Sequence, residues 1–265
     1  MIPVFSLGTS IPRVICQVYP TCNLPEVLAQ NVRSIREINP GWAYRFFDDA
    51  QMEDWIQRNY GAEVLGYYHR INPKYGAARA DFFRYLLIYK LGGVYFDIKS
   101  STSRPLDEVL RPDDVYLLSR WPEGVYAGWG KHEGLEAVGG HEFQQWHVIA
   151  APGHPFLRAV LERIVNAIDR YDPWRDGTGK RGVLHLTGPI AYTLAIAPLL
   201  AHPHRLVSSE QDLGLLYSVF GKNTTQTHRS LFKSHYTKLD EPIITGNWHQ
   251  RILWRLLWPI RKRLS

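Results

Sequence analysis

The fold is decided by residues 77–101, which read AARADFFRYLLIYKLGGVYFDIKSS. Residues 77–91 are good helix formers without Pro or Gly, which predicts an unbroken helix. Gly92 and Gly93 follow, and glycine commonly ends a helix because it adopts positive φ without strain. Over residues 94–99, apolar side chains alternate with Tyr, Asp and Lys, which predicts a short strand with one apolar face and one functional face.

Four charged side chains in this stretch are candidates for a functional site. Asp81 and Arg84 are three residues apart on the predicted helix, so they share a face and can pair. Asp97 and Lys99 are two apart, so they point to the same side of the strand or its end. A carboxylate at the carboxyl end of a strand lies where α/β sheets bind ligands. Each feature alone also fits a surface ion pair or a solvated strand end, and their combination favours a site.

This combination resembles a known family. The spacing D-x-x-R-Y, followed by G-G-V-Y-x-D, is similar to the DXD-containing region of glycosyltransferase family 32. The resemblance implies that Asp81 and Arg84 contact the donor sugar and that Tyr95 lines the nucleotide site. It also implies that Asp97 is the first acid of the motif and binds the nucleotide diphosphate through a divalent metal, Mn²⁺ or Mg²⁺.

Lys99 departs from the family pattern, which has a second acid at this position. In one interpretation, Asp97 and ligands from elsewhere still hold a metal ion, and Lys99 contacts the phosphate directly. In the other, the ammonium group replaces the metal, because it also neutralises a leaving diphosphate. We favour the metal, and metal independence stays open. Catalysis is accordingly assigned to Asp97, Lys99 and Arg84.

Other segments extend the resemblance towards both ends of the chain. Residues 11–18 predict a first strand like the one that approaches the nucleotide in the family, and Gln17 matches its pattern. Near the C-terminus, His235 is the candidate to complete the metal shell, with His228 as the fallback; a lone late histidine also fits a structural role.

The order of predicted elements argues for an α/β fold. Strands and helices alternate along the first hundred residues, which indicates a mostly parallel central sheet flanked by helices. No phosphate-binding glycine loop of the dinucleotide or NTPase type occurs in the sequence. The resemblance implies a GT-A type, Rossmann-like fold. We expect one domain over residues 1–246 and a separate C-terminal tail over residues 247–265.

The charge of the chain is concentrated in that tail. The formal net charge is +6, and five cations without any acid lie in residues 247–265, which leaves a nearly neutral body. We therefore expect no nucleic-acid partner. The tail interleaves Trp with Arg and Lys, which fits an amphipathic helix on an anionic membrane; a helix docked on the protein body is the alternative.

The cysteines and the N-terminal residues bear on location. Cys16 and Cys22 cannot build a disulfide framework, which fits a reducing compartment. The first residues do not read as a signal peptide, and no run of about 18 apolar residues predicts a membrane span. We expect a cytoplasmic protein associated peripherally with the cytoplasmic membrane face.

Two loops have open interpretations. Residues 121–142 are rich in Gly, Trp and His without a period, and fit either an acceptor-binding loop or a surface excursion. Residues 172–181 are polar and predict a mobile lid.

The predicted function is retaining transfer of a hexosyl unit from a nucleotide sugar, UDP-sugar favoured over GDP-sugar, to a glycan or lipid-linked glycan in surface polysaccharide synthesis. A catalytically inactive sugar-nucleotide- or glycan-binding pseudo-enzyme is the first alternative, because Lys99 replaces an acid. A toxin-like transferase that modifies protein side chains is the second.

Overall fold

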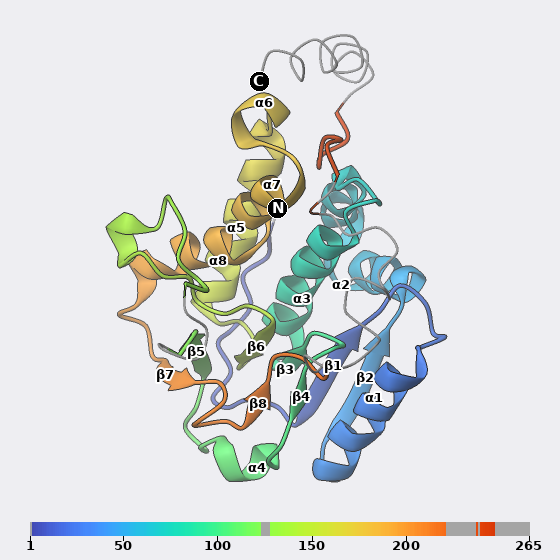
Figure 1. The fold of residues 1–265 in the computed structure, drawn as a ribbon, viewed down its shortest axis with the longest axis vertical. Helices are drawn as coiled ribbons and strands as arrows, with labels where there is room; N and C mark the ends of the chain where they lie inside the picture. The colour runs from blue at the N-terminus through green and yellow to red at the C-terminus, as the bar shows by residue number, and fades with distance from the viewer. Residues whose placement is uncertain (1, 123–127, 221–236, 238, 247–265) are drawn as a thin grey trace.

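The computed structural model describes residues 2–122, 128–220, 237 and 239–246. Its centre is a six-stranded sheet with the order β2-β1-β3-β6-β5-β7, flanked by helices on both faces (Figure 1). The pairs β1–β2, β1–β3 and β5–β7 are parallel, and β6 is antiparallel to both of its neighbours. The prediction of an α/β fold with a mostly parallel sheet is confirmed.

The elements have the following bounds. The strands are β1 Val14–Val18, β2 Ala43–Phe47, β3 Gly93–Phe96, β4 Ser101–Thr102, β5 Tyr116–Arg120, β6 His147–Ala150, β7 Arg205–Ser208 and β8 Leu215–Leu216. The α-helices are α1 Glu26–Ile38, α2 Asp49–Arg70, α3 Gly76–Leu91, α4 Leu106–Val109, α5 Pro155–Arg170, α6 Pro173–Asp176, α7 Gly179–Leu186 and α8 Pro189–Ile196. The 3-10 helices are η1 Glu136–Val138 and η2 Ala197–Leu199.

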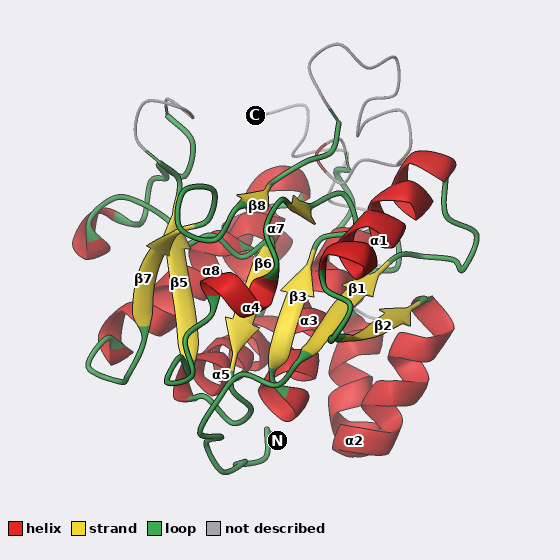
Figure 2. Ribbon diagram, turned by 90° about the horizontal axis from the view of Figure 1, so that it is seen from below, coloured by secondary structure: helices red, strands yellow, loops and turns green. Residues whose placement is uncertain are grey.

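Two cores cover the two faces of the sheet. On one face, Val94 and Phe96 of β3 pack in the same cluster as residues of α1 and α4. On the other face, Tyr95 joins the larger cluster formed with α2, α3, α5, α7 and α8. Figure 2 shows α1 and α4 in front of the sheet and α3, α5 and α8 behind it. The prediction of one apolar and one functional face for β3 is therefore wrong, because a central strand with helices on both sides buries both faces.

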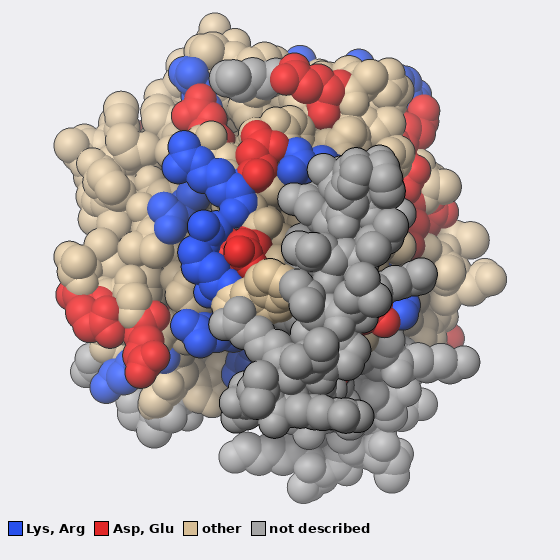
Figure 3. All heavy atoms as spheres, turned by 90° about the horizontal axis from the view of Figure 1, so that it is seen from above, with Lys and Arg blue, Asp and Glu red and all other residues tan. Residues whose placement is uncertain are grey.

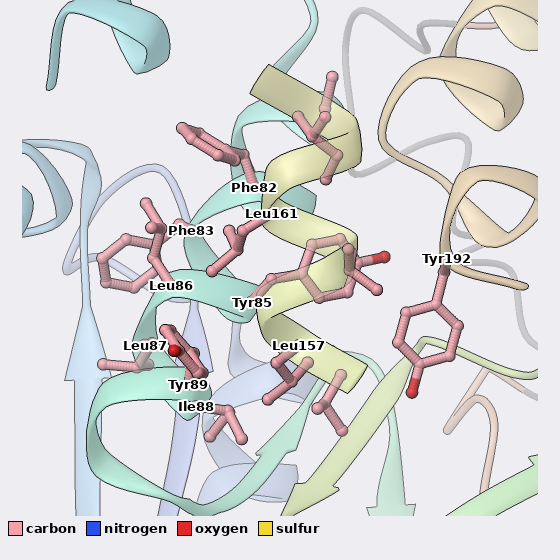
Figure 4. Packing of buried hydrophobic residues seen from close by; sticks show 14 of the residues in the cluster. Phe82, Phe83, Tyr85, Leu86, Leu87, Ile88, Tyr89, Leu157, Leu161 and Tyr192 are labelled. Carbon is pink, nitrogen blue, oxygen red and sulfur yellow. The ribbon is translucent and has the colours of Figure 1, made fainter. Parts of the chain in front are cut away.

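Helix α3 is the central helix of the larger core. Its residues from Phe82 to Tyr89 are all buried, which is expected for a helix enclosed by other elements rather than lying on the surface. Figure 4 shows its aromatic and aliphatic side chains packed beside Leu157 and Leu161 of α5. The rings of Tyr85 and Tyr192 stack with their centroids 5.6 Å apart. This packing places α3 rigidly above β3.

The double glycine after α3 is required by the close approach of the chain. Gly92 and Gly93 have φ angles of +66° and +99°, which side chains rarely adopt. A Cβ atom on Gly93 would lie 2.4 Å from Cγ1 of Val14 on the neighbouring strand. Because of this tight turn, β3 begins two residues after the last residue of α3.

The predicted lid is mostly helical. Residues 172–181 include α6 and the start of α7. Asp172 caps α6, since its carboxylate accepts a hydrogen bond of 2.8 Å from the backbone N–H of Trp174. The hydroxyl of Tyr171 donates to the Gly177 carbonyl over 2.8 Å. These contacts order the segment, so the prediction of a polar loop was wrong there.

Within the described part of the chain, residues Gly179–Leu199 form the single helical run that is long and apolar enough to cross a membrane. Of its most apolar window, 56% is buried inside the protein, where α8 contacts α5. Such burial is typical of a core helix.

Figure 3 shows the molecule from above, where Lys and Arg side chains form a band with acidic side chains next to it.

Candidate active site

The candidate site lies where β3 ends. Asp97 directly follows β3, and its backbone N–H donates a hydrogen bond of 2.8 Å to the Trp146 carbonyl just before β6. Its own carbonyl accepts from the backbone N–H of Ser100 at 2.8 Å and from the Gln17 amide at 3.2 Å. These contacts hold Asp97 at the carboxyl end of a central strand that runs parallel to β1, where α/β folds bind ligands.

Arg84 joins the helix to the strand end. Its Nη2 atom lies 3.1 Å from Oδ1 of Asp81 and 2.9 Å from Oδ1 of Asp97. Its Nη1 atom donates to the backbone carbonyl and to the side-chain oxygen of Gln145, at 2.7 and 2.8 Å. With the Ala80 carbonyl, which accepts from Nε at 3.4 Å, five oxygens surround one guanidinium group. Three of the four charged residues that the sequence selected, Asp81, Arg84 and Asp97, thus form one contiguous cluster.

Burial strengthens the electrostatics of this cluster. The side chains of Asp81 and Arg84 are each 5% exposed, whereas that of Asp97 is 24% exposed. Burial raises the pKa of Asp81 to about 6; Arg84 opposes this shift and Asp97 adds to it. Burial alone would lower the pKa of Arg84, but Asp97 and other nearby acidic groups raise it overall. Asp97 is thus the member of the cluster that a ligand meets first.

Asp81 also has partners of its own. Its Oδ2 atom accepts a hydrogen bond of 3.0 Å from the Thr187 hydroxyl, in the turn before α8. The Tyr85 hydroxyl donates to the Thr187 carbonyl at 3.0 Å. Thr187 begins a Thr-Gly-Pro segment that leads directly into α8. The predicted contact of Asp81 with a donor sugar stays a prediction, and a sugar hydroxyl would approach a carboxylate already oriented by Arg84 and Thr187.

Of the three residues predicted at the nucleotide, Gln17 and Tyr95 are buried and Asp97 is partly exposed. The Arg84 guanidinium lies over the Tyr95 ring, 4.5 Å from its centroid, and the Tyr95 hydroxyl is 3.4 Å from Oδ1 of Asp97. Gln17 accepts a hydrogen bond of 2.9 Å from the Tyr44 hydroxyl while its amide reaches the Asp97 carbonyl. Both residues support the strand end, and their contact with a nucleotide stays a prediction.

Lys99 is held by an aromatic partner. Its ammonium nitrogen donates a hydrogen bond of 2.8 Å to the Tyr217 hydroxyl and lies 4.0 Å from the centroid of that ring. The residue is 9% exposed. No acidic side chain among the residues that the structure describes forms an ion pair with it. Among the described residues this buried cation therefore has no counter-charge, which is costly and favours an anionic ligand here.

A divalent metal fits this site only in part. The described residues contain no group of three or more His, Cys, Asp or Glu side chains that could hold a metal ion. At the strand end, Asp97 supplies one carboxylate and Lys99 stands where a second acid would be. Mg²⁺ is often bound through one or two carboxylates together with substrate phosphates and water. The described donors therefore fit a metal shared between Asp97 and substrate phosphate, and do not form a complete protein site.

Some predictions lie outside the described residues. These are the assignments of His235 and His228 to the metal and of residues 247–265 to a membrane. Sequence reasoning missed Gln145 and Tyr217, which contact Arg84 and Lys99. Neither residue stands in a motif, so no local signal identifies them.

Comparison with known proteins shows which protein family this chain resembles. Residues 25–116, which include Asp81, Arg84, Asp97 and Lys99, match the glycosyltransferase sugar-binding region containing DXD motif. This part of the chain is therefore similar to the DXD-containing region of glycosyltransferases. The expected relationship to DXD glycosyltransferases is thereby confirmed, and Lys99 lies inside the matched region.

Relatives and solved structures agree with this result. Inositol phosphoceramide mannosyltransferase 1 of Schizosaccharomyces pombe is 26% identical over 74% of this chain and 54% of its own length. Mannosyl phosphorylinositol ceramide synthase SUR1 of Saccharomyces cerevisiae is 31% identical over 67% of this chain and 41% of its own length. The chain thus spans about half the length of these relatives. The solved PaToxG glycosyltransferase has a TM-score of 0.54 at 16% identity, with 72% of this chain and 71% of that chain covered, and shows that the glycosyltransferase fold is shared.

Proposed function

We propose that this protein transfers a hexosyl unit from a nucleotide sugar to a glycan or lipid-linked glycan, with retained configuration at the anomeric carbon. The observation that carries the proposal is the Arg84 guanidinium, which joins Asp81 on α3 to Asp97 at the end of β3. The cluster combines fixed positive charge with oriented carboxylates at the edge of the sheet where ligands bind. Sugar transfer from a nucleoside diphosphate needs both properties.

The cations act on the leaving group. As the bond between sugar and phosphate breaks, negative charge builds up on the diphosphate, and fixed cations stabilise that charge. Lys99 is the ammonium closest in sequence to Asp97, and a diphosphate would supply the counter-charge that this buried cation lacks among the described residues. A metal bound with Asp97 would neutralise the same phosphates. Arg84, already paired with two carboxylates, adds positive charge behind them.

The carboxylates orient the donor sugar. Asp81 and Arg84 form a buried wall of the site, and Asp81 is directed by Thr187 as well as by Arg84. Such a wall accepts hydrogen bonds from sugar hydroxyls at fixed positions, which favours one orientation of the ring. The family resemblance implies that the acceptor hydroxyl attacks from the side of the leaving group and that the departing phosphate takes its proton. We therefore assign no protein side chain as general base.

The names of the relatives guide the choice of sugar and acceptor. Both are named for adding mannose to inositol-phosphate lipids. We take mannose as the first sugar to test and a glycolipid headgroup as the first acceptor. The preference for UDP-sugars over GDP-sugars, the role in surface polysaccharide synthesis and the cytoplasmic, membrane-associated location remain proposals from the sequence.

A binding protein without catalytic activity is the second candidate. The lysine at the second-acid position favours it, because a family member that has lost an acid of its motif can keep its ligand and lose its reaction. The toxin-like transferase has support only from a shared fold.

A donor panel tests the proposal. The full chain is incubated with UDP- and GDP-sugars, each with and without Mn²⁺, and both thermal stabilisation and release of free sugar are measured. We expect one donor to stabilise the protein and to be hydrolysed slowly. Asp97→Ala should abolish hydrolysis, whereas the matched variant Asp169→Asn, on an exposed carboxylate of α5, should not.

Three other outcomes of the donor panel would contradict the proposal in whole or in part. Stabilisation without hydrolysis would identify a binding protein. If no nucleotide sugar stabilised the chain, the proposed function would be wrong. Full hydrolysis by Asp97→Ala would remove Asp97 from the mechanism.

A further inference from the structure

Four aromatic side chains lie together near the candidate site, and we call them the aromatic cluster: Trp121, Trp129, Trp146 and Tyr217. Tyr217 is its centre, with ring centroids 5.0 Å from Trp121, 5.7 Å from Trp129 and 5.6 Å from Trp146. Trp121 and Trp129 also contact each other, at 5.1 Å. All four contacts are edge-to-face, a favourable geometry for aromatic rings.

The cluster stands at the same edge of the sheet as Asp97. Trp121 directly follows β5 and Asp97 directly follows β3, and both strands are antiparallel to β6. Their carboxyl ends therefore lie on one side of the sheet, where Figure 2 shows β8 as well. Two contacts connect the cluster to the site: Tyr217 holds the Lys99 ammonium, and the Trp146 carbonyl accepts from the Asp97 backbone.

The cluster is fixed before any ligand binds. Glu142, which is 7% exposed, accepts a hydrogen bond of 2.6 Å from the Trp121 indole and lies 2.5 Å from the His132 ring through its other oxygen. Gly130 lies against the Trp121 ring, where a Cβ atom would come within 2.5 Å of it, and its φ angle is +74°. Contacts of Glu142 and Gly130 with Trp121 thus hold residues 128–142 against the end of β5.

One member of this fixed cluster faces solvent. Trp129 is 48% exposed, whereas Trp146 is 5% exposed. A single exposed aromatic residue is common on protein surfaces. Here the exposed indole is supported edge-on by Trp121 and Tyr217, and Tyr217 in turn contacts Lys99. Large, rigid and amphipathic rings of this kind suit a ligand with one apolar face and polar edges, which describes a pyranose ring.

We propose that the aromatic cluster is the acceptor subsite and that the Trp129 indole stacks on a pyranose ring of the acceptor. This inference rests on the proposed function, since it names where the second substrate binds. A sugar on Trp129 would lie beside the Tyr217–Lys99 pair, on the side of the sheet edge opposite to Gln17 and β1. The donor nucleotide is predicted near Gln17, so the two substrates would meet at Asp97 and Lys99.

The test uses sugar binding as well as activity. Saturation-transfer NMR is recorded on the full chain with three probes, the methyl glycosides α-mannoside, α-glucoside and β-galactoside, and separately with UDP. Trp129→Ala, Trp129→Phe and the control Leu206→Ala are compared; Leu206 is 57% exposed on β7 and lies outside the cluster. We expect at least one glycoside to bind, Trp129→Ala to weaken it on the order of tenfold, and Trp129→Phe to restore most of the affinity.

The outcomes separate this inference from the proposed function. Unchanged glycoside binding by Trp129→Ala, or binding of none of the three glycosides to the wild type, would overturn the acceptor subsite. Loss of UDP binding with glycoside binding intact would assign the cluster to the nucleotide base and also overturn it. Glycoside binding that depends on Trp129 in a chain without donor hydrolysis would support the subsite and leave transfer unsupported. In an active chain, Trp129→Ala should raise the acceptor KM on the order of tenfold, and the control Leu206→Ala should leave both the acceptor KM and donor hydrolysis unchanged.

Discussion

Replacing Asp81 with Asn should make the protein more stable at neutral pH while it removes function. Burial raises the pKa of Asp81 from 3.8 to about 6. Since the folded-state pKa lies above the unfolded value, the folded protein binds more protons in this window, and its stability falls as pH rises through it. Each pKa unit corresponds to about 1.4 kcal/mol, so ionised Asp81 costs the folded state up to about 3 kcal/mol above this window.

The Asn side chain avoids this cost with little change of shape. Arg84 keeps its contact of 2.9 Å with Asp97 and its two bonds to Gln145, so the substitution leaves no unpaired buried cation. The amide oxygen at position 81 can still accept from Arg84, and the Thr187 hydroxyl oxygen can accept from the amide NH2 group. We therefore expect the free energy of unfolding to rise by up to about 3 kcal/mol at neutral pH, with the difference vanishing below the ordinary Asp pKa of about 4.

Urea unfolding followed by tryptophan fluorescence at several pH values measures this difference. Asp169→Asn is the matched control with the opposite sign. Burial alone would raise the pKa of Asp169, but hydrogen bonds from Arg70 and Tyr67 lower it overall, so its Asn variant should be less stable at neutral pH. Donor hydrolysis by Asp81→Asn should fall on the order of a hundredfold. A variant that is less stable than wild type at neutral pH, with the gap widening as pH rises, would refute the electrostatic reasoning; full hydrolysis would refute the role of Asp81.

Three further predictions concern the metal, the tail and the fold. Lys99→Asp should make donor hydrolysis more dependent on Mn²⁺; an unchanged response to chelator would exclude Lys99 as a replacement for the metal. Deletion from Trp248 onward should release the protein from vesicles containing anionic lipid while donor hydrolysis is kept; binding that survives the deletion would contradict the membrane role of the tail. Gly93→Ala should lower the free energy of unfolding by at least about 2 kcal/mol, because its Cβ would collide with Val14. The control Gly66→Ala, with open space in α2, should cause no loss; equal effects of the two substitutions in urea unfolding would contradict the argument.

The sequence alone predicts the main helix of the fold and the place where it ends. The expected helix over residues 77–91 is α3, Gly76–Leu91, and the double glycine ends it at positive φ. Helix and strand periods and glycine conformations depend on neighbours a few residues away, and the sequence shows those neighbours directly. The segment at 172–181 was misread because its two short helices depend on a cap and on a contact made by Tyr171.

The candidate site divides in the same way. The sequence by itself selected Asp81, Arg84, Asp97 and Lys99, because their spacing places them on one helix face and one strand end. Only the tertiary structure decided how they are held: Gln145 contacts Arg84 from 61 residues away, and Tyr217 contacts Lys99 from 118 residues away. These partners depend on how β6 and β8 pack beside β3 and β4, and no periodic pattern in the sequence near Arg84 or Lys99 predicts that packing. The burial that raises the pKa of Asp81 arises from that packing as well, since it depends on the elements that enclose α3 rather than on the residues beside Asp81 in the chain.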